Sequence, residues 1–573
     1  MILVCFAGCG EKSGEEIMKA IGEEASKDAE TISLYLMSEQ PVSKEQEERM
    51  EAAVNEITET DLTIHVDLRY YTPDEYYAKL EEHLKKMDEY YGSGDAGKKK
   101  DNPVYIDENG LPKVHYPKIE SFDVNVFYFG GYDKYLEYKS AGYLKDVTEE
   151  FIGSSKDMKA AINNNLVNQF KEVNGIYDAI PTNRAIGEYT YLLVSKDVFD
   201  DMKYSVEQLT SLACAGCQDI LKTVSTDASK DYSKYVPLYT NVEDINVSGV
   251  KYFGASNTNV AANPFSILAG TYNNSWTKGV ENSYPIMDSL FNSLDNGNYT
   301  VEEQLKILKG YELNGYYGTE ADADKPFAVG YIKGSLDVIE QYGDDYEIIT
   351  IENPTLTNED LYESLFAVAK YANDEKASMQ ILTLLNTNAE FRNLILYGVE
   401  GENYVWEDSE VLDENGDPYS VIARQVKDPD KLYVMDPMKT GNMAIAYPAK
   451  GEDPRAVEYI FDHNDGIVVD YIIGFSFYKA YKTKAISKDA YDMVVALTDK
   501  SAAIYEKILA AKDQASLDAA MAELKELELS AEYAAVMDDD EESGSAYAYY
   551  IEWLVEKGLI FKEIDPDAEI IVK

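Results

Sequence analysis

The feature that most constrains the fold is an alternation of strand and helix patterns between residues 30 and 129. In the run TISLYLM, Ile32, Leu34 and Leu36 recur at every second position, which is the period of a β-strand. Ser43 precedes Gln46 by three residues, and this capping-box spacing predicts that a helix begins there. Two further strand patterns, LTIHVDL and DVNVFYF, follow along the chain. Strands separated by capped helices predict βαβ units and a mainly parallel sheet.

The length and the charge of the chain limit its organisation and its partners. A chain of 573 residues exceeds what one core usually organises, so we expect two lobes. The 105 acidic residues outnumber the 52 basic ones and give a net charge of −53, which disfavours nucleic acid and anionic membranes as partners. The 48 tyrosines suit surfaces that recognise polar ligands, because a tyrosine ring packs while its hydroxyl stays solvated.

The first ten residues, MILVCFAGCG, are apolar and end in small residues before a cysteine. The segment Phe6-Ala7-Gly8-Cys9 resembles the lipobox of a bacterial lipoprotein signal, although the basic n-region is absent and Phe6 stands where Leu is usual. We therefore expect a truncated signal over residues 1–9, lipidation at Cys9 and a flexible tether over residues 10–29. The protein would then be anchored at the outer face of the cytoplasmic membrane. The alternative is an apolar N-terminus with an incidental cysteine.

Cys214 and Cys217 form a Cys-x-x-Cys motif. A redox motif would follow a strand at the start of a helix, and a zinc site would need a second pair of ligands. None of the four histidines stands at metal spacing near the motif. We therefore expect a local disulfide or two free thiols, and no metal site. We also expect His65, on the polar face of the second strand pattern, to be solvated or hydrogen-bonded rather than a metal ligand.

Motifs of the common enzyme classes are missing from the sequence. It contains no G-x-S-x-G, no P-loop, no G-x-G-x-x-G after a strand and no H-E-x-x-H. A pair of glycosidase carboxylates stays open as an alternative, because the many acids provide pairs without any selective pattern. We predict a non-enzymatic protein without a cofactor.

Seven segments carry a resemblance to a known family. They are the lipobox-like start, TISLYLMSEQ, DVNVFYFGGYDKYLEYKSAGYLKDVTEEF, GIYDAIPTNRAIGEYTYLLVSKDVF, FAVGYIKGS, ILTLLNTNAEFRNLILYGVEGENYVWED and TGNMAIAYP. In this order they resemble the extracellular solute-binding proteins of family 1, which are carbohydrate-type lipoproteins of ABC importers in Gram-positive bacteria. The resemblance implies an α/β, two-lobed periplasmic-binding-protein-like fold (type II) with an interlobe cleft.

The domain boundaries follow from the same resemblance. We expect lobe 1 over residues 30–180 and about 348–400, and lobe 2 over residues 181–347 and about 401–484. A helical segment over residues 485–573, rich in Ala, Glu, Lys and Leu, would pack on the lobes.

The resemblance implies a function without bond chemistry. The protein would bind an oligosaccharide in the cleft, close on it, and present it to the permease subunits of an ABC transporter. We expect a monomer. Two alternatives stay open: the same fold binding a peptide, an amino-acid derivative or a polyamine, and a surface hydrolase.

Candidate ligand contacts come from loops and from matched segments. A sugar site needs aromatic faces and polar groups that pair with hydroxyls, and ligands of α/β sheets lie outside the carboxyl ends of strands. Loops after the first three strands provide Ser38, Glu39, Tyr71, Gly131 and Tyr132. By resemblance, Asn183, Arg184 and Glu188 face the cleft, and Tyr331, Lys333 and Ser335 match a loop in which Tyr331 would be the aromatic platform. Further aromatic candidates, for which core packing is the alternative, are Trp276, Trp406 and Phe475.

Arg184 allows a sharper hypothesis about the ligand. A guanidinium pairs well with a carboxylate, so Arg184 would suit an acidic sugar such as a uronate. The alternative, which we favour, is an interlobe salt bridge between Arg184 and one of the many acidic residues of the chain.

Overall fold

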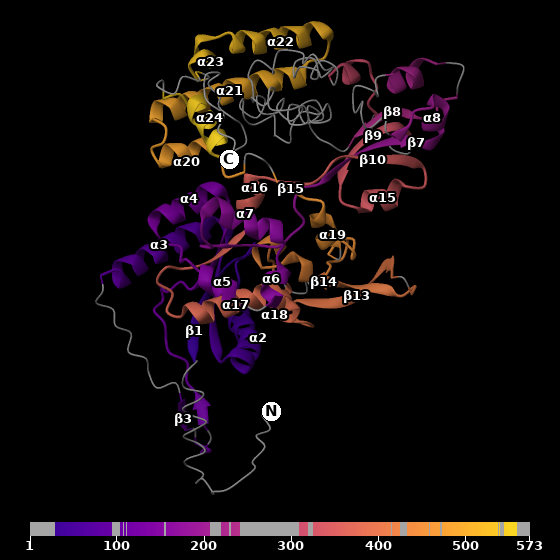
Figure 1. Ribbon diagram of the computed structural model, residues 1–573. Helices are drawn as coiled ribbons and strands as arrows, with labels where there is room; N and C mark the ends of the chain where they lie inside the picture. Colours follow the sequence, from indigo (N-terminus) through magenta and orange to yellow (C-terminus); the bar gives the residue numbers. More distant parts are fainter. Residues whose placement is uncertain are drawn as a thin grey trace, which may run out of the picture. The chain divides into compact units, whose positions relative to one another are not determined.

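The computed structural model describes residues 29–93, 104–106, 108–110, 112–153, 156–206, 219–227, 231–240, 309–318, 325–413, 415–424, 433–457, 459–469, 473–536, 538 and 544–557. These residues form two compact units (Figure 1). Unit 1 draws on residues 1–185 and 358–465, and unit 2 on residues 186–357 and 466–573. Three segments lie in the other unit from the lobe in which the sequence boundaries placed them: residues 181–185 and 401–465 belong to unit 1, and residues 348–357 belong to unit 2. The C-terminal helical segment belongs to unit 2.

Unit 1 contains a five-stranded sheet that begins with the strands predicted from the sequence. β1 (Glu30–Met37) is buried along its length and pairs in parallel with β2 (Ile64–Tyr71) and β5 (Val126–Phe129). β12 (Leu365–Val368) and β6 (Ile180–Pro181) complete the order β2-β1-β5-β12-β6. β12 is the strand that returns from unit 2, and it runs antiparallel to both of its neighbours. The βαβ pattern of the sequence does not predict this insertion.

The helices between the parallel strands begin where the sequence predicts. The Ser43 hydroxyl accepts a hydrogen bond from the Gln46 N–H at 3.2 Å and caps α2 (Lys44–Leu62). Pro73 occupies the first turn of α3 (Pro73–Tyr91), as the missing N–H of proline favours. Further helices of unit 1 are α4 (Tyr132–Ala141), α5 (Thr148–Gly153), α6 (Lys156–Ala161), α7 (Asn164–Asn174), α16 (Asn358–Tyr362), α17 (Glu375–Thr387), α18 (Ala389–Tyr397) and α19 (Tyr459–Asp465).

Two antiparallel hairpins of unit 1 stand outside the sheet. β3 (Val104–Ile106) pairs with β4 (Pro112–Val114), and β13 (Tyr404–Leu412) pairs with β14 (Pro418–Arg424). In the second hairpin the Asp413 carboxylate accepts hydrogen bonds from the N–H groups of residues 415 and 417, at 2.8 and 2.9 Å. Asp413 therefore acts as a turn residue.

Unit 2 contains a four-stranded sheet in the order β10-β7-β9-β8. Its strands are β7 (Tyr189–Ser195), β8 (Val236–Thr240), β9 (Phe327–Gly334) and β10 (Tyr346–Glu352). β7 is antiparallel to both β9 and β10, and β8 is parallel to β9. Helices α8 (Lys196–Met202) and α15 (Asp337–Tyr342) follow β7 and β9.

The C-terminal part of unit 2 is helical, as its composition predicts. Its helices surround one apolar cluster in which Phe475 packs against Phe477, Tyr550 and Trp553, with ring centroids 4.7, 4.7 and 5.1 Å away. The helices are α20 (Phe477–Lys482), α21 (Lys488–Ala510), α22 (Gln514–Glu528), α23 (Ala531–Val536) and α24 (Ala546–Glu556).

The chain passes between the units three times, at residues 185/186, 357/358 and 465/466. On the unit 2 side, two of these crossings pair with each other, because β11 (Thr355–Leu356) runs parallel to β15 (Val468–Val469). Glycines make this close packing feasible: a Cβ on Gly466 would lie 2.0 Å from the Tyr189 hydroxyl.

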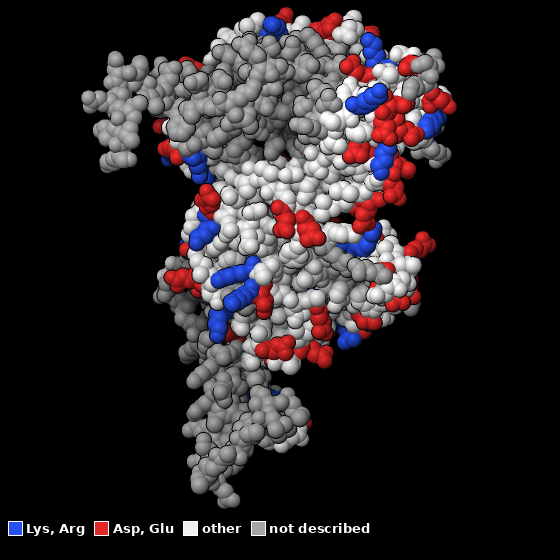
Figure 2. Space-filling view, turned by 45° about the vertical axis from the view of Figure 1, so that its right-hand side comes forward, with Lys and Arg blue, Asp and Glu red and all other residues white. Residues whose placement is uncertain are grey.

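Charged side chains of both signs lie side by side on the described surface (Figure 2). Many are exposed ion pairs, such as Lys79 with Glu82 at 3.0 Å and Lys234 with Asp197 at 2.8 Å. Across the described part of the chain, no helix combines the length and the apolar character that a bilayer crossing requires.

Candidate functional site

The carboxyl ends of three parallel strands bring several of the predicted residues to one edge of the unit 1 sheet. The register pairs Met37 with Tyr71, so Ser38 and Glu39 continue from β1 beside the end of β2. Gly131 continues from β5, the other neighbour of β1. Gly131 has a φ of +98°, and no atom lies within 4 Å of the position that a Cβ would take. We call this row of loops the unit 1 edge.

Gly130 lets the unit 1 edge close tightly between β5 and β12. A Cβ on Gly130 would lie 2.2 Å from the main-chain oxygen of Glu363 and 2.9 Å from the Tyr128 hydroxyl. The Gly131 N–H donates to the main-chain oxygen of Tyr362 at 2.7 Å. A side chain on Gly130 would therefore push β12, and with it Glu363, away from the edge.

A segment far along the chain covers the edge beside β1. The Glu39 N–H donates to the oxygen of Val434 at 3.0 Å, and Ser38 forms an isolated antiparallel bridge with Met435. Lys439, in a short 3₁₀ helix (Pro437–Lys439), lies 2.9 Å from the Glu39 carboxylate and 3.1 Å from Asp436. Burial lowers the pKa of the Lys439 ammonium, but hydrogen bonds to Glu39 and Asp436 outweigh burial, so its pKa lies above the usual value.

Sequence reasoning missed Lys439 as a candidate. Lys439 directly precedes the quoted segment TGNMAIAYP. However, nothing in the local sequence shows that Lys439 contacts Glu39, which lies 400 residues earlier.

Asn183 is buried inside unit 1 and does not face solvent. Its amide donates to Asn442 at 3.0 Å and accepts from the N–H of Asn163 at 3.0 Å, while its main-chain oxygen accepts from Met443 at 2.8 Å. This set of bonds ties the end of β6 to the segment that covers the edge. The geometry gives Asn183 a supporting position rather than a surface position.

Arg184 is also buried, with 5% of its surface exposed. Its guanidinium lies 2.5 Å from a Glu363 carboxylate oxygen and 3.5 Å from the Asp360 carboxylate, and it donates to the main-chain oxygens of Asp360 and Ala185. Arg184 thus forms a salt bridge with acidic residues, but the bridge lies within unit 1 and not between the lobes as we expected, because Asp360 and Glu363 belong to the same unit as Arg184.

Two tyrosines border the unit 1 edge. The Tyr71 ring is half-buried and stacks on Tyr35, with centroids 5.9 Å apart and an interplanar angle of 26°. The Tyr132 ring packs on Tyr362 with centroids 4.6 Å apart. Burial raises the pKa of Tyr71, so at neutral pH its hydroxyl is protonated and donates as well as accepts hydrogen bonds.

In unit 2, Glu188, Lys333 and Ser335 lie at one edge of the sheet. Tyr189 at the start of β7 is opposite Gly334 at the end of β9, which brings Glu188 beside Ser335. Glu188 is exposed, and Lys333 and Ser335 are half-buried. The Tyr191 hydroxyl donates to the main-chain oxygen of Ser335 at 3.2 Å and holds this loop against β7.

The structure places Tyr331 in the core and not at a surface. It is fully buried in β9, in a cluster with Leu192, Val194 and Leu238. Because these apolar residues enclose the side chain, the Tyr331 ring is not accessible to a ligand. Phe475 is likewise 9% exposed and belongs to the C-terminal aromatic cluster described above. Phe475 is therefore a core residue, which was the alternative to a ligand contact.

Trp406 is an exposed aromatic residue on β13, with 38% of its surface accessible. Its ring lies 5.0 Å from that of Tyr447. The base of the hairpin contacts the start of α2, because the amides of Gln46 and Asn403 exchange hydrogen bonds of 3.3 and 3.2 Å. Gln46 lies in the first turn of α2, which begins just after the loop that follows β1. Trp276, Cys9, Cys214 and Cys217 lie outside the described residues.

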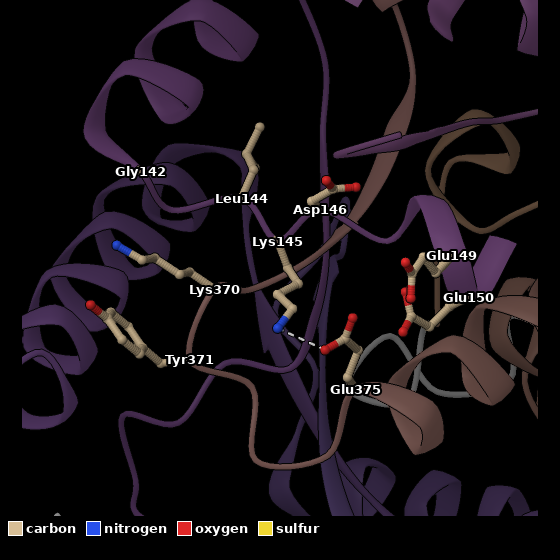
Figure 3. Close-up of a pocket in the computed structure, with 9 residues that line it drawn as sticks. All are labelled: Gly142, Leu144, Lys145, Asp146, Glu149, Glu150, Lys370, Tyr371 and Glu375. Atoms are coloured by element: carbon tan, nitrogen blue, oxygen red, sulfur yellow. Dashed lines mark ion pairs between the residues drawn. The ribbon is translucent and has the colours of Figure 1, made fainter. Parts of the chain in front are cut away.

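A cavity of about 670 Å³ lies at the opposite end of the same sheet (Figure 3). Leu144, which lines the cavity, forms an isolated β-bridge with Ala369. Ala369 directly follows β12, and because β12 runs antiparallel to β5, it lies beside the start of β5. The lining mixes both signs of charge: Lys145 pairs with Glu375 at 2.7 Å, and Lys370 stacks on Tyr371. None of the residues predicted from the sequence lines this cavity.

Within the described residues, no group of three or more His, Cys, Asp or Glu side chains has the arrangement of a metal site. His65, which we expected to be hydrogen-bonded, lies 2.7 Å from Glu59 and 3.4 Å from Glu51.

Two α/β units joined by three crossings, with the returning strand inserted antiparallel in the first sheet, form a two-lobed periplasmic-binding-protein-like fold. The fold class expected from the sequence is therefore confirmed. The cleft between the lobes stays a prediction.

No protein-family model and no curated protein matches the chain. Among solved structures, the chain is similar to an N-glycan transport solute-binding protein, NgtS, from Streptococcus pneumoniae, with 17% identity, 92% of this chain and 99% of that chain covered, and a TM-score of 0.49.

It is also similar to a solute-binding protein from Bifidobacterium longum infantis that is associated with an ABC transporter and binds HMO, with 12% identity, coverages of 93% and 99% and a TM-score of 0.44. The sugar-binding protein MalE from Xanthomonas citri matches with 11% identity, coverages of 92% and 99% and a TM-score of 0.37. These are carbohydrate solute-binding proteins, the group that the sequence resembles. Because the TM-scores are below 0.5, the fold assignment rests on the strand order of this chain.

Proposed function

We propose that this chain is the extracellular substrate-binding lipoprotein of an ABC importer, which captures an oligosaccharide between its two units and delivers it to the permease. The observation that carries the proposal is the unit 1 edge, where Tyr71 ends one of three adjacent parallel strands and Glu39 and Gly131 follow the other two. Ligands of open α/β sheets bind at such edges. The edge of unit 2 that holds Glu188, Lys333 and Ser335 would supply the second half of the site.

The chemistry of these groups suits a sugar. Sugar hydroxyls donate to carboxylates and accept from ammonium groups, and Glu39, Asp436 and Lys439 offer both at the unit 1 edge. The flat C–H face of a sugar ring packs on an aromatic ring. Tyr71 and the exposed Trp406 are the aromatic residues of unit 1 that we propose for this role, and Trp276 is a further candidate from the sequence.

The proposed cycle makes and breaks no covalent bond. Ligand binding would shift the two units toward a closed arrangement that the permease recognises, with the three crossings as the hinge. We further propose lipidation at Cys9, attachment to the outer face of the cytoplasmic membrane, and a monomeric state. Support for these three points comes from the sequence alone.

Thermal unfolding of the full chain against a panel of neutral oligosaccharides, peptides and polyamines tests the proposal. A ligand that binds the native state alone stabilises it by about 2.7 kcal/mol at a hundredfold excess over its Kd. We expect one oligosaccharide class to raise the Tm, with no product formed on standing. A rise with peptides or polyamines alone would overturn the oligosaccharide assignment. Release of shortened glycans would instead favour a surface hydrolase.

A further inference from the structure

Two cations at the unit 1 edge, Lys439 and Arg184, are each held by two carboxylates. Lys439 contacts Glu39 at 2.9 Å and Asp436 at 3.1 Å. Arg184 contacts Glu363 at 2.5 Å and Asp360 at 3.5 Å. Each of these groups therefore carries a net charge of −1 at neutral pH.

A third cation beside the edge follows the same pattern. Lys134, in the first turn of α4, contacts Glu81 at 2.8 Å and Glu137 at 2.9 Å. Its ammonium lies 5.2 Å from the centroid of the Tyr77 ring, and the Tyr77 hydroxyl accepts from the Gly130 N–H at 3.3 Å. Lys134 therefore lies beside the loop after β5, and its positive charge is paired with two carboxylates.

Tyr128 is a buried residue near the end of β5, opposite Phe366 of β12. Burial raises the pKa of its hydroxyl most, and the charges of Asp436, Glu363 and Glu39 raise it further. The hydroxyl lies 2.9 Å from the position that a Cβ on Gly130 would take. Glu39 follows β1 and Glu363 precedes β12, and these two strands are the neighbours of β5 on either side. Both carboxylate–cation groups therefore belong to the unit 1 edge and flank the end of β5.

We infer that the unit 1 edge selects uncharged oligosaccharides and rejects anionic ones, with Glu39 and Glu363 as the residues that determine this specificity. The inference rests on the proposed function. A uronate or a sialic acid would have to displace a carboxylate that is already paired with Lys439 or Arg184, and would then lie beside the displaced group. A neutral hydroxyl meets no such competition, because each carboxylate oxygen still has lone pairs that accept from it.

Calorimetric titration tests the inference with paired probes. The probes are neutral oligosaccharides of glucose, galactose, mannose and xylose, each beside its counterpart in which the terminal sugar carries a carboxylate. We expect the unaltered chain to bind the neutral member about tenfold more tightly or better. Equal binding, or preference for the acidic member, would overturn the inference and leave the proposed function intact. No binding of any oligosaccharide would overturn the proposed function and the inference with it.

The variants Glu39→Gln and Glu363→Gln locate the effect. Each removes one carboxylate from a cation at the edge, so each should lower the neutral-to-acidic affinity ratio by about threefold or more. Glu375→Gln is the matched control, because Glu375 pairs with Lys145 at the opposite end of the same sheet (Figure 3). The same change in ratio for all three variants would show that net charge alone is responsible, and would overturn the assignment to the edge.

Repeating the titration at high salt tests separately whether the preference for the neutral probe arises at the edge or from the charge of the whole chain. Screening at about 1 M salt, where the Debye length is about 3 Å, removes long-range repulsion by the charge of the whole chain. Close contacts at the edge are screened less, so most of the preference for the neutral probe should persist. Complete loss of the preference in high salt would contradict the inference.

Discussion

The side-chain amide of Asn464 donates to the main-chain oxygen of Arg184 at 2.8 Å. Asn464 precedes the third crossing between the units, and Arg184 precedes the first. The Arg184 guanidinium also donates to the main-chain oxygen of Asp360 at 2.9 Å, just after the second crossing. One buried arginine therefore fastens the unit 1 ends of all three crossings to one another.

Replacing Arg184 should loosen the link between the first and second crossings, whereas the bond from Asn464 to the main-chain oxygen of residue 184 is retained. Arg184→Met leaves the carbonyls of Asp360 and Ala185 without their donor, and we expect a loss of about 1–3 kcal/mol in the free energy of unfolding. Hydrogen exchange should quicken at the Thr182 and Val468 amides, which bond to Ser364 and Pro354, more than in β1.

Arg69→Met is the matched control for that experiment, since Arg69 is likewise paired, with Asp67 at 2.6 Å, but lies on β2. Faster exchange at the crossings in both variants would contradict a specific role of Arg184.

Substitutions of Tyr331 separate a core residue from an aromatic platform. Tyr331→Ala should cost roughly 3–5 kcal/mol of stability, because the ring is fully buried in β9. Tyr331→Phe should cost about 1 kcal/mol and leave ligand affinity unchanged. Chemical denaturation and calorimetry measure the two quantities. A stable Tyr331→Ala protein with weakened sugar binding would show that the ring is a ligand contact after all.

Trp406 should behave in the opposite way. Its indole ring is 38% exposed and contacts Tyr447, so Trp406→Ala should cost about 1 kcal/mol of stability. If the ring packs on a sugar as proposed, affinity should fall about tenfold or more. An unchanged Kd would remove Trp406 from the proposed site without affecting the fold.

His65 predicts a pH dependence of stability. Hydrogen bonds to Glu51 and Glu59 raise its pKa above the ordinary value of 6.5, and they outweigh burial, which lowers it. A raised folded-state pKa stabilises the protein below pH 6.5, and this contribution is lost as the pH rises through the folded-state value. The stability advantage of the unaltered chain over His65→Gln should therefore shrink from about pH 5.5 to about pH 8.5.

The comparison of the unaltered chain with His65→Gln cancels the contribution of the other histidines, because both proteins contain them. Burial and the neighbouring Arg69 lower the pKa of His83, which gives the opposite slope, but His83 is common to both proteins. A constant difference between them over this pH range would contradict the prediction.

Local patterns predicted the elements of unit 1 well, because they record which side of each strand and helix is buried. The alternation in LTIHVDL corresponds to the half-buried face of β2, and the spacing of Ser43 and Gln46 corresponds to the start of α2. The antiparallel insertion of β12 between β5 and β6 was not predictable. Its position depends on the return of the chain from unit 2, which leaves no periodic signal.

The candidate site was predictable only where it follows directly from a strand. Glu39 and Gly131 were found because loops after parallel strands share an edge. Lys439 was missed because its partner Glu39 lies 400 residues away. Tyr331 was assigned to a ligand loop by resemblance, but it lies inside the buried strand β9. A strand that is covered on both faces has no polar alternation, so the local sequence did not correct this assignment.

Native mass spectrometry of the full chain, after incubation with a mixture of neutral oligosaccharides, peptides and polyamines, is the most direct test of the central claim that this protein binds an oligosaccharide without altering it. We predict a one-to-one complex with an intact oligosaccharide, which is released unchanged when the protein unfolds. A complex with a peptide or a polyamine, or shortened glycans in the solution, would contradict the claim.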